Sequence, residues 1–242
     1  MGEINEVIKQ LQERKSVRVF EKRNVPQSVK DEVIAAAFQA PTAGNMMLYT
    51  IIDITDPEIK NQLSVLCDNQ PFIAKAPIVL VFLADYSKWY DTYLAAELSP
   101  RKPGAGDLLL SCADALIAAQ NTVVAAHSFG LGSCYIGDII ENCEQVRKLL
   151  SLPEYALPVT MVVYGYPTQQ QLDRKKPIRF DSSHIVHTNA YRKMPPHELI
   201  DMYNESGTKE SLHDFCQRKY MSDFSLEMNR SVAEYLKNFN HS

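Results

Sequence analysis

The stretch DLLLSCADALIAAQNTVVAAH, residues 107–127, contains the longest helical pattern in the sequence. Its apolar residues lie nearly all around the helical cylinder and many are alanine, which is typical of a helix buried at the centre of a fold. Gly130 follows the pattern and predicts the end of the helix. We therefore expect the remaining elements to pack around this helix.

Apolar runs before and after this helix predict strands. Residues 78–83, IVLVFL, form a continuous apolar run that is typical of a strand buried on both faces. Further strands are predicted at residues 49–54 and 159–164, and helices at 4–11, after Pro26, and at 56–66, 141–150, 198–203 and 224–239. Helices and strands mix without strict alternation, which predicts an α+β fold. We expect one domain over residues 1–195 and a C-terminal helical extension over 196–242 that packs on a partner subunit.

The composition of the 242 residues excludes several classes of protein. With 45% hydrophobic residues, 22% charged residues and a net charge of −4, the chain is neither disordered nor a general binder of nucleic acid or anionic membranes. The longest stretch without polar side chains, Ala76 to Ala84, is far shorter than the roughly 20 residues of a membrane-spanning helix. No signal peptide is recognisable, so we expect a cytoplasmic protein without a membrane partner.

Motifs of hydrolases and metalloproteins are missing from the sequence. The five cysteines form no CxxC pair and are expected to be reduced packing residues. No G-x-S-x-G motif occurs, and His197-Glu198 lacks the second histidine of a zinc protease. His184 and His187 lie in a polar stretch and are expected to be exposed histidines, so we predict no metal site.

Four segments have residue types that suit a ligand. The basic segment RKSVR at 14–18 offers cations and a hydroxyl to a phosphate, although a solvated helix end is the better explanation of this cluster alone. PTAGN at 41–45, followed by the weaker polar pair at 69–70, allows a flat ligand to approach the backbone, or is an ordinary turn. GLGSCYIGD at 130–138 fits neither a dinucleotide nor a Walker A motif, yet its backbone N–H groups can face a ligand or simply begin a strand. KKPIRF at 175–180 is a second cationic group.

Taken together and in order, five segments resemble the nitroreductase family of flavin-dependent NAD(P)H oxidoreductases. They are RKSVRVF at 14–20, APTAGNMMLY at 40–49, NQPFIAKAP at 69–77, GLGSCYIGDI at 130–139 and KPIRF at 176–180. The resemblance implies a central, mostly antiparallel sheet flanked by helices, and an intertwined homodimer that binds one FMN per subunit at the interface.

The resemblance also implies a role for individual residues around FMN. Arg18 would reach the N1 and C2-carbonyl edge of the flavin and stabilise the negative charge that reduction places there. The phosphate would be held by Arg14, Ser16, Lys176 and Arg179, with Lys15 alongside. The ribityl chain or pyrimidine edge would meet Thr42, Asn45 and Gln70, and flavin N5 would lie near the backbone of Tyr135, Ile136, Gly137 and Asp138. A glycine often stands where this chain has Asp138.

The implied reaction is a ping-pong hydride transfer from NADPH or NADH, through flavin N5, to a nitroaromatic, quinone or flavin acceptor. The cofactor carries this chemistry, so no side chain is named as acid or base. Two alternatives share the fold or the cofactor. One is a specialised flavin enzyme that catalyses reductive dehalogenation or flavin breakdown, and the other is a non-catalytic protein that binds or senses FMN.

Overall fold

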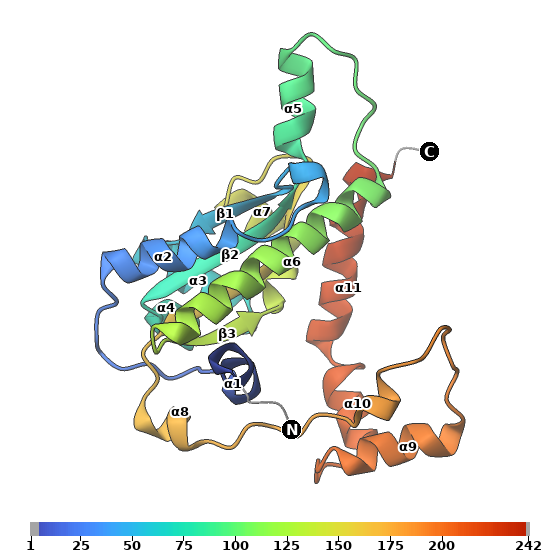
Figure 1. Ribbon diagram of the computed structural model, residues 1–242. Coiled ribbons are helices and arrows are strands. Elements are labelled where there is room, and N and C mark those ends of the chain that lie inside the picture. Colours follow the sequence, from blue (N-terminus) through green and yellow to red (C-terminus); the bar gives the residue numbers. More distant parts are fainter. Residues whose placement is uncertain (1–4, 241–242) are drawn as a thin grey trace. The chain divides into compact units, whose positions relative to one another are not determined.

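The computed structural model describes residues 5–240 and centres on a four-stranded antiparallel sheet (Figure 1). The strand order is β1-β2-β4-β3, where β1 is Tyr49–Asp53, β2 Ile78–Asp85, β3 Gly132–Ile136 and β4 Ala156–Gly165. The predicted mostly antiparallel sheet and the α+β class are thereby confirmed. The start of the predicted first helix, Ile4, lies outside the described residues.

Helices occupy most of the remaining chain. The α-helices are α1 Glu6–Glu13, α2 Gln27–Ala37, α3 Pro57–Leu66, α4 Phe72–Lys75, α5 Ser87–Ala95, α6 Ala105–Ser128, α7 Cys143–Leu149, α8 Gln169–Asp173, α9 Pro196–Glu205, α10 Leu212–Lys219 and α11 Asp223–Leu236. Short 3-10 helices lie at η1 Ala43–Asn45, η2 Asp138–Ile140, η3 Ser182–His184 and η4 Lys237–Phe239.

Strand β2 is the centre of two hydrophobic layers. All eight of its residues are buried, as its continuous apolar run predicts. Ile78, Leu80 and Phe82 join the cluster that α2 and α6 complete on one face of the sheet. Val79, Val81 and Leu83 join the cluster that α3, α4 and α7 complete on the other face. The alternation follows from the two-residue period of a strand, so each helix layer takes every second side chain.

Helix α6 is the central helix that its sequence predicts. Ala115, Ala118 and Ala119 are fully buried against the sheet, where small side chains allow a close approach. Gly130 follows the helix with φ of +74°, a left-handed conformation that ends it. By length and composition alone α6 is also apolar enough to cross a membrane, a property that it shares with core helices of soluble proteins.

The chain divides into two compact units. The first comprises the residues up to Arg174 together with those from Glu227 onward, and it contains the sheet. The second, Lys175–Leu226, contains η3, α9 and α10, and inside it the Tyr203 and Phe215 rings pack edge to face with centroids 5.5 Å apart. The predicted boundary between a domain ending at 195 and an extension from 196 stays a prediction.

Besides the four-residue α4, three α-helices lie where no helix is predicted. Helix α5 projects from the end of β2 (Figure 1), and α8 and α10 are short. None of the three has a continuous apolar stripe; only Ser87 in α5 and Gln171 in α8 are buried, and no residue of α10 is. Periodicity in apolar residues therefore carries little signal for these segments. The extended segment after Ser16 forms isolated bridges at Ser16 and Phe20 instead of a full strand.

A close approach between Val17 and Gly132 attaches the N-terminal segment to β3. Val17 N donates a 2.9 Å hydrogen bond to the Ser133 carbonyl, and Ser16 forms a parallel bridge with Ser133. A Cβ built at Gly132 would lie 2.5–2.9 Å from three side-chain atoms of Val17, which is too close for any carbon. Only glycine at position 132 allows this contact.

We expect Gly132→Ala to lower the free energy of unfolding by about 1–3 kcal/mol, because the added methyl group must displace Val17. Urea denaturation followed by circular dichroism measures the change. Gly106→Ala in α6 is the matched control: a Cβ there meets nothing within 4 Å, so helix propensity predicts a gain of up to about 1 kcal/mol. Equal stability of the Gly132→Ala variant and the unmodified protein would contradict the close approach.

Candidate functional site

The structure brings the basic segment 14–18 and the glycine-bounded segment 130–138 side by side. Their backbones meet through the Val17–Ser133 hydrogen bond described above, and the Arg14 guanidinium carbon lies 5.6 Å from the centre of the Tyr135 ring. Two segments that are more than a hundred residues apart in the sequence therefore share one edge of the sheet. Burial raises the pKa of Tyr135 to about 12, so its phenol stays neutral at physiological pH.

Arg14 has an unused hydrogen-bond donor in this place. Its Nε is buried and has no partner among the described residues. A buried donor without a partner is costly, and an anionic ligand would satisfy it. Arg18 is exposed, with its guanidinium carbon 5.9 Å from the centre of the Phe72 ring, and its backbone N donates to Gln171 Oε1 at 3.2 Å. Both arginines thus offer guanidinium donors to a ligand beside β3.

Lys15 and Arg174 fix the backbone of the basic segment. Lys15 Nζ donates to the Leu172 carbonyl at 2.5 Å and also contacts the Arg174 carbonyl, while the Arg174 guanidinium donates to the Ser16 carbonyl. The Lys15 ammonium is therefore largely committed to the protein. No motif in the sequence points to Arg174, although this residue directly precedes the cationic pair at 175–176.

Gln70 and Asp138 meet at the end of β3. Gln70 Nε2 donates 2.9 Å hydrogen bonds to both Asp138 Oδ2 and the Cys67 carbonyl. Ile136 is buried in the core, so only its backbone can face a ligand. A Cβ at Gly137 would meet nothing within 4 Å, and this open space above the backbone can admit a flat ring.

The buried carboxylate of Asp114 organises the loop that carries Thr42 and Asn45. Asp114 lies on α6 and accepts hydrogen bonds from the Thr42 hydroxyl and, at 3.1 Å each, from the backbone N–H groups of Ala43 and Leu48. The Thr42 hydroxyl also accepts from Met47 N at 2.7 Å. Its donor is consequently used inside the loop, whereas Asn45 is exposed. Asp114 has no recognisable motif in the sequence, which is why sequence reasoning misses it.

The predicted residues occupy separate places along α6. Arg14 lines a small cavity with Val123 and His127, near the end of this helix, whereas the loop with Thr42 is attached at Asp114. Nine residues of helix separate Asp114 from Val123, or about 13 Å. Lys176 and Arg179 belong to the second unit, and their approach to the basic segment stays a prediction.

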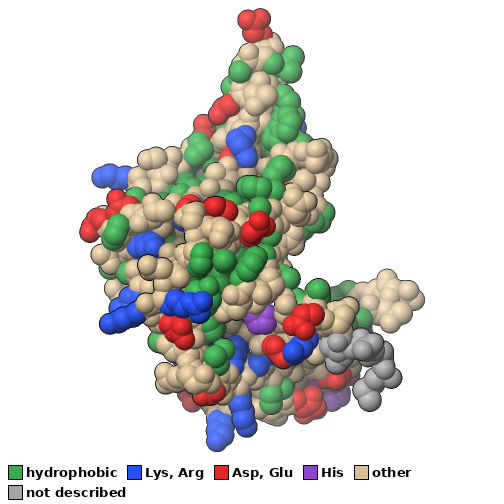
Figure 2. All heavy atoms as spheres, turned by 60° about the vertical axis from the view of Figure 1, so that its left-hand side comes forward, with side chains coloured by type: hydrophobic (Ala, Val, Ile, Leu, Met, Phe, Trp, Pro, Cys, Tyr) green, Lys and Arg blue, Asp and Glu red, His purple; other side chains and the backbone are tan. Residues whose placement is uncertain are grey.

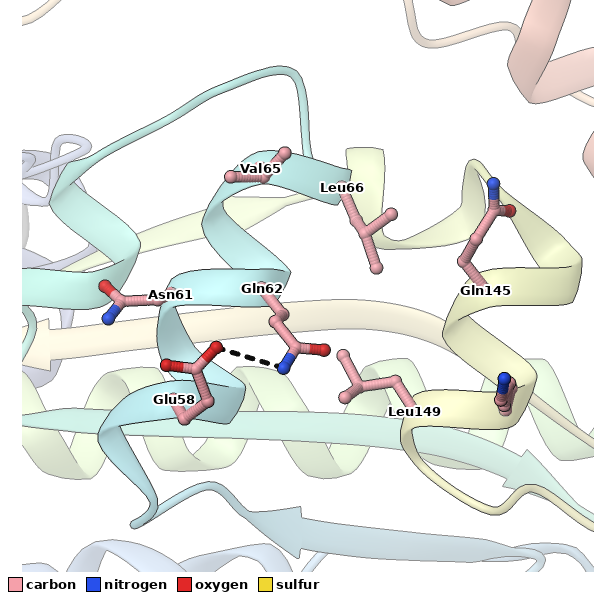
Figure 3. A pocket seen from close by; sticks show the side chains of 8 residues that line it. Glu58, Asn61, Gln62, Val65, Leu66, Gln145 and Leu149 are labelled. Atoms are coloured by element: carbon pink, nitrogen blue, oxygen red, sulfur yellow. Dashed lines mark hydrogen bonds between the residues drawn. The ribbon is translucent and has the colours of Figure 1, made fainter.

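A pocket of about 670 Å³ lies between α3 and α7 (Figure 3). Its wall is mostly amide and aliphatic side chains, and Gln62 Nε2 donates to Glu58 Oε1 at 3.2 Å. None of the predicted site residues lines it. We therefore place the candidate site at the β3 edge.

Comparison with known proteins agrees with this architecture. Residues 11–166 match the sequence model of the Nitroreductase family. The chain belongs to the nitroreductase family. The FMN reductase (NADPH) of Bacillus subtilis is 34% identical over 192 residues, which cover 78% of this chain and 75% of that protein. The FMN reductase [NAD(P)H] of the same organism is 34% identical over 240 residues, 96% of this chain and 91% of that protein.

A solved structure supports the same conclusion about the fold of this nitroreductase-family chain. The NfrA1 nitroreductase from Bacillus subtilis superimposes with a TM-score of 0.83 at 27% identity, over 95% of this chain and 98% of that one. The family and fold that the five sequence segments predict are thus confirmed.

We expect Asp114→Asn to lower the free energy of unfolding by about 2–4 kcal/mol, because an amide cannot accept from all three donors of the 42–48 loop. Urea denaturation measures the loss. Asp91→Asn removes an exposed carboxylate from α5 and serves as the control, with an expected change within about 0.5 kcal/mol. A similar effect of both substitutions would show that Asp114 does not hold the loop.

Proposed function

We propose that this protein is an FMN-dependent NAD(P)H oxidoreductase that reduces nitroaromatic, quinone or flavin acceptors by a ping-pong mechanism. The observations that carry the proposal are the unpaired, buried Nε of Arg14 beside β3 and the open backbone at Gly137, directly after the end of the same strand. A phosphate suits the first feature and a flat ring suits the second. Membership of the nitroreductase family and the FMN reductases among its relatives support the same cofactor.

The residues beside β3 have the chemistry that FMN requires. The phosphate would be held by Arg14 and Ser16, joined by Lys176 and Arg179, with Lys15 fixing the backbone alongside. When bound, FMN would supply the hydride chemistry. Arg18 would place a permanent positive charge at the pyrimidine edge and stabilise the negative charge of the reduced ring.

Polar groups on neighbouring loops would orient the rest of the cofactor. Gln70 and the backbone from Tyr135 to Asp138 would border the ring, because the hydrogen bond from Gln70 to Asp138 fixes both. Thr42 and Asn45 would contact the ribityl chain or the pyrimidine edge. Since their loop is attached to another part of α6, a site at a subunit interface explains how both groups contribute.

An apolar surface on α6 supports the proposed homodimer. Leu109 is 71% exposed, and Leu110, Leu116 and Ile117 on the same helix are also exposed. The space-filling view shows hydrophobic side chains reaching the surface in several places below the projecting α5 (Figure 2). Large exposed apolar side chains on a core helix are typical of a subunit interface. We further propose that the dimer is cytoplasmic.

Arg18→Ala is expected to weaken FMN binding about tenfold or more and to lower the potential of the bound flavin, because a charge-assisted contact is lost. The visible spectrum after gel filtration measures FMN retention, and anaerobic addition of NADPH or NADH should bleach the flavin bands of the unmodified protein. Arg23→Ala is the control, because Arg23 also lies over an aromatic ring, Tyr166, outside the candidate site. A bound flavin that neither nucleotide reduces would refute the proposed function.

Leu109→Glu is expected to convert the dimer into monomers, because it places a charge in the proposed apolar interface. Light scattering coupled to gel filtration measures the molar mass. Val65→Glu provides the matched control: Val65 is 60% exposed on α3, on the opposite face of the sheet, so this variant should remain dimeric. An unchanged mass of the Leu109→Glu variant would place the interface elsewhere.

A further inference from the structure

Glu141 is a buried acidic residue. Neither the proposed FMN contacts nor the packing of the core explains its burial. Its side chain directly follows η2, and the residue is only 4% exposed. Its Oε1 is buried and has no hydrogen-bond partner among the described residues. An ionised carboxylate in such a place is costly, so the group needs either a cation or a proton.

The acidic neighbour of Glu141 is Asp138, one turn earlier. Glu141 N donates to the Asp138 carbonyl at 3.0 Å, which closes the 3-10 turn. Side chains three residues apart in such a turn eclipse one another, and the two carboxyl groups are close enough to hydrogen-bond when one is protonated. Gln70 Nε2 holds Asp138 Oδ2 at 2.9 Å and thereby orients the Asp138 carboxyl.

The groups around Glu141 favour its protonated form. Burial, together with the negative charges of Asp138, Asp68 and Glu227, raises the pKa of Glu141 to about 7. The facing Cys67 thiol stays neutral, because burial and the two acids raise its pKa. The cation in this region, Arg230, pairs with Glu227 and Glu144.

Helix α11 closes the turn from outside. Ser231 Oγ donates to the Ile140 carbonyl at 2.6 Å and accepts from Cys143 N at 2.9 Å. Asn142 N donates to Glu227 Oε1 at 3.2 Å. These contacts keep Glu141 away from solvent. Glu141 can therefore act on the candidate site through the carboxyl group of Asp138.

We propose that Asp138 and Glu141 share one proton and form a proton-holding pair beside the proposed flavin ring, where Asp138 faces the ring and Glu141 acts as a positioning residue through it. The inference rests on the proposed function for its flavin part. With one proton the pair has a single negative charge. When the proton is lost near neutral pH, a second negative charge adjoins the ring and disfavours its reduced, electron-rich form.

The flavin test compares the midpoint potential of bound FMN at pH 6 and pH 8.5 in the unmodified protein and in Glu141→Gln. The amide at position 141 carries no charge, so the second negative charge cannot form between these two pH values. Between pH 6 and pH 8.5, the equilibrium ratio of reduced to oxidised FMN should fall about tenfold more in the unmodified protein than in Glu141→Gln. This is the effect of one proton whose pKa differs by one unit between the oxidised and the reduced protein. Ionisation of the FMN phosphate affects both proteins alike and cancels in the comparison.

A second test needs no flavin. The ordinary pKa of a glutamate is 4.5, and Glu141 titrates near 7 when folded, so between these values the folded protein binds more protons than the unfolded chain. The urea midpoint of the flavin-free protein should therefore fall relative to that of Glu141→Gln as the pH rises from 5 to 7.5, and should stay constant above pH 8. Asp138→Asn removes one of the charges that raise the pKa and should shift this fall to lower pH.

Asp68→Asn is the matched control for both tests. It removes an exposed negative charge near Glu141 and leaves both carboxyl groups of the pair in place. The flavin potential and the urea midpoint should therefore still change with pH, and each change should be centred at a slightly lower pH. If Asp68→Asn abolished these changes as fully as Glu141→Gln does, general surface charge would explain the effect and the pair would be refuted.

The two tests separate failure of the inference from failure of the proposed function. Identical stability profiles in the unmodified protein and Glu141→Gln would show that no shared proton exists. Different stability profiles with parallel potentials would overturn the role of the pair at the flavin while FMN binding stands. A protein that binds no FMN would overturn the proposed function and the flavin role together, whereas the stability profiles would still decide whether the proton is shared.

Discussion

Strand β2 must be covered on both faces, and this requirement positions the five helices that pack on the sheet. Its eight buried residues need one layer from α2 and α6 and another from α3, α4 and α7. Strand β2 pairs with β1 on one side and with β4 on the other, and β3 pairs with the far side of β4. Strand β3 is therefore an edge of the sheet. An edge strand has unpaired backbone groups, and the segment at Ser16 and Val17 satisfies part of them. The candidate site forms where that edge is only partly covered.

The candidate site therefore depends more on backbone packing than on any local motif. Gly132 lacks a Cβ, Val17 fills the space, and the arginines on either side of Val17 are brought to the edge of the sheet. Lys15 donates to the carbonyls of Leu172 and Arg174, and Arg174 donates to the carbonyl of Ser16, so these contacts fix the same segment. A cationic segment that the sequence alone explains better as a solvated helix end is held at the edge of the sheet by these contacts.

The sequence predicts the elements that bury a continuous or strongly periodic apolar surface, and it predicts little else. Residues 78–83 and 107–127 identify β2 and α6 because burial alone determines their composition. Helices α5 and α10 escape prediction since their apolar residues form no buried stripe. For the candidate site, the family resemblance predicts which residues would contact the cofactor. It does not supply Asp114, Arg174 or Glu141, because each acts through a contact with a distant segment that no local spacing encodes.

The electrostatic character of the site depends on burial and not on the number of charged residues. The chain has a net charge of −4, which by itself disfavours the binding of an anion. Arg14 and Arg18 nevertheless lie at one part of the β3 edge, and the acids Asp138 and Glu141 lie together at its end. Since burial favours the protonated form of Glu141, the acidic end has less negative charge than its carboxyl groups suggest. In the proposed function, this distribution of charge would favour a phosphate at the arginines and permit an electron-rich ring beside the carboxyl pair.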